Sequence, residues 1–320
     1  MTAVVVSALL LGACSGAGDS DVRRNAGAQD PTDDVAGLIA KVAPDQPEVI
    51  APSAEGKKLV AEAGDVTVSV PVNPDKAITL NPSSEGKSTA LALKVNLPEE
   101  VSAGPGRVAT DGTVVYEATG DGADAAVQVL QDGSVRLQTI TPAPGGPDEF
   151  TYTFGEGVSP VSTKDGGIEL LQDTGEVALT VGTVGQAWAV DANGTEVATK
   201  YKIEGDELIQ TVTPGPGAVY PIVADPKITR AWWNTTVYFK RKETRRIGDG
   251  LTGLAMVAVA IPDPTIMKIV GAGAGLGWAY VRWIYSSGKC LKFVYVMNAA
   301  NVWEPYGGDE AGGYCKKKKK

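Results

Sequence analysis

The sequence contains no histidine and only three cysteines among its 320 residues. The missing histidine excludes Ser-His-Asp and Cys-His nucleophiles, zinc sites of the HExxH kind and imidazole pH switches. Three cysteines without a CxxC spacing cannot build a four-cysteine zinc site. We therefore predict that the protein is not an enzyme and that it holds no cofactor and no metal.

Long apolar runs are also missing. Hydrophobic residues make up 43% of the chain and charged residues 21%, which is typical of a folded protein with a sizeable core. A membrane-spanning helix needs roughly 20 consecutive apolar residues, and the longest apolar stretches here are shorter. The composition indicates one or two folded domains.

The first 13 residues carry no charge and include an apolar run at 4–11, which is typical of a short export signal. Leu11-Gly12-Ala13-Cys14 resembles the lipobox of bacterial lipoproteins, in which a peptidase cuts before the cysteine and a lipid is attached to its thiol. The basic residue expected before the apolar run is missing. We predict a signal peptide at 1–13 and a lipid on Cys14, which would hold the protein on the outer face of the cell membrane. A plainly secreted form and a merely apolar tail are the alternatives.

Small and polar residues dominate 14–55, so this stretch is predicted to be a flexible tether. If Cys14 carries lipid, an even pair of cysteines remains. An exported protein would most simply join Cys290 to Cys315 in a disulfide. Two free buried thiols would instead require a reducing compartment.

The net charge of −9 hides a division of the chain. Residues 228–320 hold 15 basic and 6 acidic residues, a balance of +9, which leaves 14 basic and 32 acidic residues, a balance of −18, in residues 1–227. Such asymmetry indicates two domains. We predict an acidic all-β domain at 56–226 and a smaller, basic α+β domain at 227–315, followed by a lysine tail at 316–320.

The acidic part alternates apolar and polar residues in short runs separated by turn dipeptides such as Asp-Gly and Asn-Gly. No run there has a sustained helical period. This pattern predicts an antiparallel meander or sandwich. The expected strands are 66–72, 89–95, 113–117, 126–130, 135–140, 149–154, 177–181, 199–203 and 207–212.

The basic part is expected to begin with a strand at 232–239 and to contain another at 289–297. Between them, 251–261 and 266–285 are apolar helix candidates separated by Pro-Asp-Pro-Thr, which predicts an αα-hairpin over 251–285. Both arms are too short to span a bilayer alone. Small-xxx-small glycine pairs in the second arm permit close packing, either inside a soluble domain or in lipid. These glycines are Gly271, Gly273, Gly275 and Gly277.

The candidate contact residues of the basic part are cations and aromatics that would meet a membrane or another anionic surface. Arg282 lies among aromatic residues and could either snorkel at a membrane interface or sit on the domain surface. Besides the four glycines, the candidates are Lys240, Arg241, Lys242, Arg245, Arg246, Trp278 and Trp283. Anionic lipid and wall polymer are both candidate partners, a protein partner is unspecified, and the exported address disfavours nucleic acid.

The sequence contains one fragment of a catalytic motif. Asp173-Thr174-Gly175 matches the triplet around an aspartic protease carboxylate, but such enzymes need a second triplet, and the sequence has none. We interpret the triplet as a turn between two strands.

Several segments of 107–315 resemble a family of exported actinobacterial proteins with a β-rich part and a two-cysteine carboxyl-terminal part. The resemblance implies no activity and no functional residues. Its segments are DGSVRLQT (132–139), WAVDANG (188–194), YPIVADP (220–226), FKRKET (239–244), PDPT (262–265), GKCL (288–291) and GGYC (312–315).

The sequence thus predicts a lipid-anchored cell-envelope protein that acts as a binding or presentation module at the boundary of membrane and wall. One alternative is a membrane-active effector that uses the glycine-rich hairpin. The other is a hydrolase that uses acidic residues in loops of the β-rich part.

Overall fold

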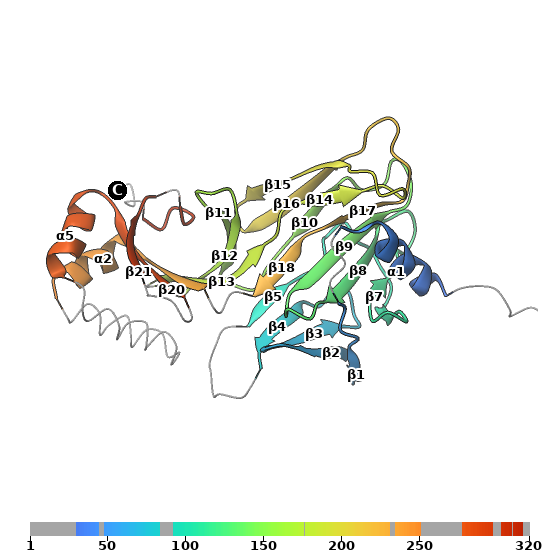
Figure 1. Cartoon of the computed structure of the whole chain (residues 1–320), viewed down its shortest axis with the longest axis horizontal. Helices are drawn as coiled ribbons and strands as arrows, with labels where there is room; N and C mark the ends of the chain where they lie inside the picture. Colours follow the sequence, from blue (N-terminus) through green and yellow to red (C-terminus); the bar gives the residue numbers. More distant parts are fainter. Residues whose placement is uncertain are drawn as a thin grey trace, which may run out of the picture.

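The computed structural model describes residues 30–44, 48–83, 92–175, 177–230, 234–250, 277–296, 302–308 and 310–315. It is mainly antiparallel β, and its strands form three sheets (Figure 1). The helices are α1 (Pro31–Val42), α2 (Arg241–Gly248) and α5 (Trp278–Ser286).

The five-stranded sheet runs in the order β1 (Ser53–Glu55), β2 (Lys58–Ala63), β3 (Val66–Pro71), β4 (Ile78–Pro82) and β5 (Leu93–Val95). The three-stranded sheet runs in the order β10 (Glu149–Tyr152), β16 (Glu207–Thr213) and β15 (Ala198–Glu204).

The third sheet has 13 strands, nine of which follow one path from edge to edge. That path is β21 (Val302–Tyr306), β20 (Cys290–Val296), β19 (Asn234–Phe239), β13 (Val177–Val184), β18 (Lys227–Arg230), β9 (Val135–Thr141), β8 (Asp124–Val129), β7 (Val114–Tyr116) and β6 (Arg107–Val108). The others are β11 (Val158–Ser162) and β12 (Ile168–Asp173), which join β13, and β14 (Trp188–Val190) and β17 (Ile222–Asp225), which join β9.

The main core lies between the three sheets and receives one face of nearly every strand in the β-rich part. Alternation of buried and half-exposed residues in β3 and β16 shows why the period-2 pattern predicted these strands. Each of the nine strands expected between 56 and 226 overlaps a strand of the structure, although residues 89–91 of the second lie outside the described residues. The predicted fold class is therefore confirmed.

The turn dipeptides behave as expected. Gly112, Gly133, Gly166, Gly194 and Gly205 all have positive φ, between 60° and 91°. That region is open to glycine and strained for most other residues. These turns fix the order in which strands pair along the chain.

The tether predicted over 14–55 is wrong from residue 31 onward, because α1 and β1 lie within it. Asp30 caps α1 by accepting a hydrogen bond from the Thr32 amide at 3.1 Å. Ile39 and Val42 are buried against β7, β8, β9 and β17 on the outer face of the large sheet. Burial of this apolar face outweighs the polar composition of the segment.

The domain boundary predicted at 226 does not divide the large sheet. β18 follows residue 226 but pairs with β9 and β13, both of which precede it. β13 also pairs with β19, so one strand carries hydrogen bonds to both parts of the chain. The sheet is continuous because β13 pairs with β19 through Val177–Leu179 and with β18 through Gly182–Val184.

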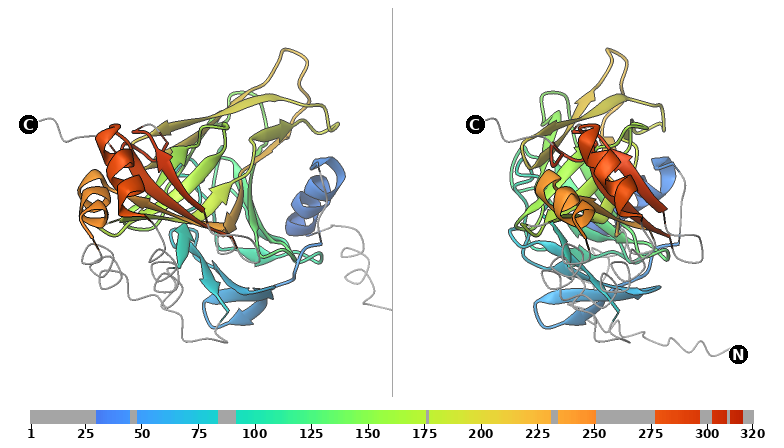
Figure 2. Two further views of the ribbon diagram at one scale, coloured as in Figure 1. Left: turned by 60° about the vertical axis from the view of Figure 1, so that its left-hand side comes forward. Right: turned by 90° about the vertical axis from the view of Figure 1, so that its left-hand side faces the viewer.

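The carboxyl-terminal end of this sheet is covered on both faces. α2 and α5 pack on one face, as Figure 2 shows, over a core that includes Phe239 and Phe293. The chain after β21 packs on the opposite face with Leu171, Tyr238 and both carboxyl-terminal cysteines. At Gly312 a Cβ atom would lie 2.8 Å from Val161 Cγ1, so glycine permits this close approach.

Candidate anionic-surface binding site

α2 and α5 form an antiparallel pair at one end of the molecule's long axis, and α1 lies toward the other end (Figure 1). At the start of α2, Arg241 Nη2 donates to the Tyr285 carbonyl oxygen near the end of α5 at 2.9 Å. At the end of α2, the Gly248 carbonyl oxygen accepts from Arg282 Nε at 2.8 Å. These two contacts fix the helices relative to each other.

The inner faces of the two helices join the sheet through apolar and polar contacts. Ile247, Val281 and Ile284 are fully buried on it. The buried Thr244 hydroxyl accepts from the Leu291 amide at 3.1 Å and donates to the Lys240 carbonyl oxygen at 3.1 Å. The helix pair is therefore a fixed part of the fold, and its outer face can present side chains in a defined arrangement.

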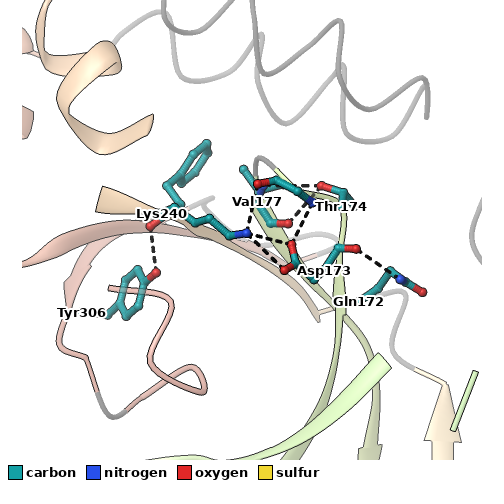
Figure 3. Close-up of polar contacts among 8 residues, drawn as sticks. Gln172, Asp173, Thr174, Val177, Lys240 and Tyr306 are labelled. Atoms are coloured by element: carbon teal, nitrogen blue, oxygen red, sulfur yellow. Dashed lines mark hydrogen bonds and ion pairs between the residues drawn. The ribbon is translucent and has the colours of Figure 1, made fainter. Parts of the chain in front are cut away.

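Lys240 is half-exposed, and its ammonium is held by residues of the same chain (Figure 3). Its ammonium lies 3.0 and 3.1 Å from the two carboxylate oxygens of Asp173 and 3.0 Å from the Gly175 carbonyl oxygen. The same ammonium lies 5.2 Å from the centre of the Tyr314 ring. An ammonium has three donors, and all three have acceptors here.

Two more of the predicted cations are also held by neighbours. Arg241 stacks on the Tyr285 ring at 4.2 Å and donates to the Lys289 carbonyl oxygen at 3.2 Å. Arg246 lies 3.7 Å from the buried carboxylate of Glu243. These contacts stabilise α2 and reduce the share of both charges that is available to a partner.

The exposed residues of the pair include cations and two aromatic rings. Lys242 is exposed, and Arg245 is 67% exposed with Asp249 at 3.9 Å. Trp283 is 54% and Tyr280 39% exposed, and their rings stack with centroids 5.9 Å apart. We call the following six exposed residues the cationic–aromatic surface: Lys242, Arg245, Tyr280, Arg282, Trp283 and Lys289.

Several predicted contact residues lie elsewhere. Trp278 is half-buried against the core beneath the helices, and Gly277 is the residue that precedes α5. Gly271, Gly273, Gly275 and most of the predicted hairpin lie outside the described residues, as do Cys14, the signal peptide and the lysine tail. Lys289 was not predicted as a contact residue because it stands at the start of a run that predicts a strand.

The predicted disulfide between Cys290 and Cys315 is confirmed, with Cα atoms 5.5 Å apart. It joins β20 to the last described residues of the chain. Tyr314 is thereby held beside Lys240 and Asp173, so the bridge and the Lys240 contacts lie on the same face of the sheet. Burial and the nearby Asp173 carboxylate raise the pKa of the Tyr314 phenol, which keeps this ring uncharged.

The triplet Asp173-Thr174-Gly175 forms a turn after β12, as predicted. Asp173 Oδ1 accepts a hydrogen bond from the Gly175 amide at 2.8 Å, and Gly175 has a φ of +87°. The carboxylate is occupied by Lys240 and by its own turn. These contacts give the Asp173 carboxylate a structural role in the turn and in holding Lys240.

A cleft of about 460 Å³ opens between the β11–β12 turn and β20–β21. Two of its carboxylates have partners: Glu169 accepts from the Tyr238 hydroxyl at 2.9 Å, and Glu304 lies 3.3 Å from Lys292 Nζ. Among the described residues there is no group of three or more acidic or cysteine side chains that could hold a metal ion. The cleft therefore offers weaker support for a binding function than the exposed helix pair does.

Within the part of the chain that the structure describes, no helix is both long and apolar enough to cross a membrane. α5 has nine residues and α2 has eight.

No protein-family model matches the chain, and no curated protein matches it. Among solved structures, it is similar to the KRT10-binding region domain of the pneumococcal serine rich repeat protein PsrP. The identity is 13%, the match covers 46% of this chain and 83% of that domain, and the TM-score is 0.17. A likeness of this size carries no argument about function, which must come from the site itself.

Proposed function

We propose that the protein is a cell-envelope binding module that attaches to an anionic surface through its cationic–aromatic surface. One observation carries the proposal: α2, α5 and the residues that follow α5 expose four cations and two stacked aromatic rings, and both helices are fixed to the sheet. The segments 240–249 and 277–289 contain seven basic and two acidic residues, a balance of +5. The balance of −18 in residues 1–227 makes this end the electrostatically favoured point of contact.

The proposed location is the outer face of the cell membrane, with Cys14 as the lipid attachment point. The motif Leu11-Gly12-Ala13-Cys14 supports it. We expect mass spectrometry of the protein from its native cells to find a new amino terminus at Cys14 that carries acyl chains. An unmodified Cys14 thiol in the mature protein would overturn the anchor and leave the binding function untouched.

The binding function predicts a charge effect that is local to the helix pair. Each lysine or arginine near an anionic surface contributes about 1 kcal/mol, a factor of about five in affinity. Replacing Lys242 and Arg245 with glutamine should therefore weaken binding to anionic vesicles and to immobilised polyphosphate by about 25-fold at low salt. Co-sedimentation with both materials measures this effect.

The matched control replaces Lys200 and Lys202 with glutamine. Both lysines are exposed on β15, so the control removes the same net charge from another part of the molecule. We expect it to weaken binding less than threefold. Equal losses in the two variants would mean that the overall charge drives the attraction, and failure of the unmodified protein to bind either material would overturn the proposed function.

A further inference from the structure

We infer that the anionic surface is the headgroup region of a lipid bilayer, and that the stacked Tyr280–Trp283 pair enters it. This inference rests on the proposed function and names its partner. The described residues contain five exposed large apolar side chains, and two of them are Tyr280 and Trp283, one helical turn apart on α5. Trp is highly buried on average in folded proteins, so a Trp that is more than half exposed on a fixed helix needs a reason.

Rings and charges occur here in the combination that suits a membrane interface. Trp and Tyr have an apolar body and a polar atom, and they concentrate where hydrocarbon meets headgroups. Arg282 stands between the two rings in sequence, and Lys289 follows the helix. Long basic side chains can lay their methylene stems along the apolar part of an interface while their charges reach lipid phosphates.

The position of the site suits a bilayer. Two clefts in the described part of the chain are lined by residues outside the cationic–aromatic surface. α2 and α5 lie at one end of the molecule, beyond most of the β-rich part, so this end can face a flat surface (Figures 1 and 2).

The contacts of α5 with α2 and with the sheet hold its exposed residues in place before any surface is met. The inner residues Val281 and Ile284 are buried, and Arg282 Nε is held by the Gly248 carbonyl oxygen. α5 therefore need not refold or turn over to present its rings. Surface helices of this kind bind through buried apolar area together with attraction to anionic lipid.

The test uses the full chain with Cys14→Ser, so that no acyl chain contributes to binding. Its probes are vesicles of phosphatidylglycerol with phosphatidylcholine, vesicles of phosphatidylcholine alone, and immobilised polyphosphate. The variant Tyr280→Ser/Trp283→Ser is compared with Val108→Ser/Val219→Ser, which removes two other exposed apolar side chains. Circular dichroism and unfolding by urea establish that each variant is folded.

We expect the aromatic variant to bind anionic vesicles at least about tenfold more weakly and to lose the binding that the parent keeps at high salt. Its binding to polyphosphate should change less than threefold, and the valine variant should match the parent throughout. In the parent, brominated lipids should quench tryptophan fluorescence, and Trp283→Phe should remove most of that quenching.

Each other outcome has a definite meaning. Binding to polyphosphate without binding to vesicles overturns the inference while the proposed function stands. Equal vesicle binding by the parent and the aromatic variant also overturns it, because charge alone would then hold the protein. Binding to neither material removes the proposed function and the inference together.

Discussion

Loss of the Cys290–Cys315 disulfide should lower the free energy of unfolding by about 3.5 kcal/mol. The bridge closes a loop with a sequence separation of 25, and the chain-entropy model assigns roughly this stabilisation to a loop of that length. The native contacts agree with a large effect, because Cys290 is fully buried and Cys315 is 4% exposed within one apolar cluster. Urea unfolding of the oxidised and the reduced protein, followed by tryptophan fluorescence, measures the difference.

The comparison should be made in a Cys14→Ser background, so that the bridge is the sole target of the reductant. The double variant Cys290→Ser/Cys315→Ser provides a second measurement that needs no reductant. We expect its urea midpoint to fall to that of the reduced protein or lower, because each serine also brings a hydroxyl into the buried site. Coincident unfolding curves for the oxidised and reduced forms would contradict the prediction.

Strands could be predicted from the sequence where one face is buried and the other is partly exposed. β16 alternates between buried and half-exposed residues, and Gly205 marks the turn before it. β17 was missed, although it lies in the predicted β-rich part. All four of its residues are buried, so its sequence has no alternation to reveal a strand.

Helices α1 and α2 were harder to predict from local sequence than the strands. α2 has the sequence RKETRRIG, in which Ile247 is the single large apolar residue, so it was interpreted as a basic cluster. In the structure this segment is a helix. Its Thr244 hydroxyl donates to the Lys240 carbonyl oxygen and accepts from the Leu291 amide of β20. The region of α1 was assigned to the tether, because its apolar face gains its stability from a sheet formed more than 70 residues later.

The candidate site was predicted in part. Exposure of Lys242, Arg245 and Trp283 agrees with their predicted place at the surface. Lys240 differs because its partner, Asp173, lies 67 positions earlier in the sequence. No local pattern shows which of the five cations between 240 and 246 will pair with a carboxylate elsewhere in the chain. That pairing depends on the tertiary fold.

Asp225 should make the stability of the protein fall as the pH rises. Its side chain is fully buried on β17, with Arg136 Nε 3.6 Å from Oδ2. In the described part of the chain, neither carboxyl oxygen has a hydrogen-bond partner of ordinary geometry. Burial raises the pKa of this carboxyl to about 8, although the charge of Arg136 and a weaker polar contact with the Trp188 side chain act in the opposite direction.

The sign of the effect follows from the two pKa values. The unfolded carboxyl has its ordinary value of 3.8, and the folded one has a value of about 8. Between these values the folded state binds a proton that the unfolded state has lost. Stability contributed by that proton is fully present below about pH 4 and is lost as the pH rises toward 8, by at most about 1.4 kcal/mol per pH unit.

The variant Asp225→Asn isolates this effect, because the amide has nearly the shape of the neutral acid and does not titrate. Between about pH 5 and pH 7 we expect the wild type to lose about 2 to 3 kcal/mol of stability relative to the variant. Urea unfolding of both proteins across this range gives the difference directly, and the other carboxylates cancel in the subtraction. Parallel stability curves would show that Asp225 is ionised throughout as the partner of Arg136, in which case Arg136→Met should destabilise the protein by about 3 to 5 kcal/mol at neutral pH.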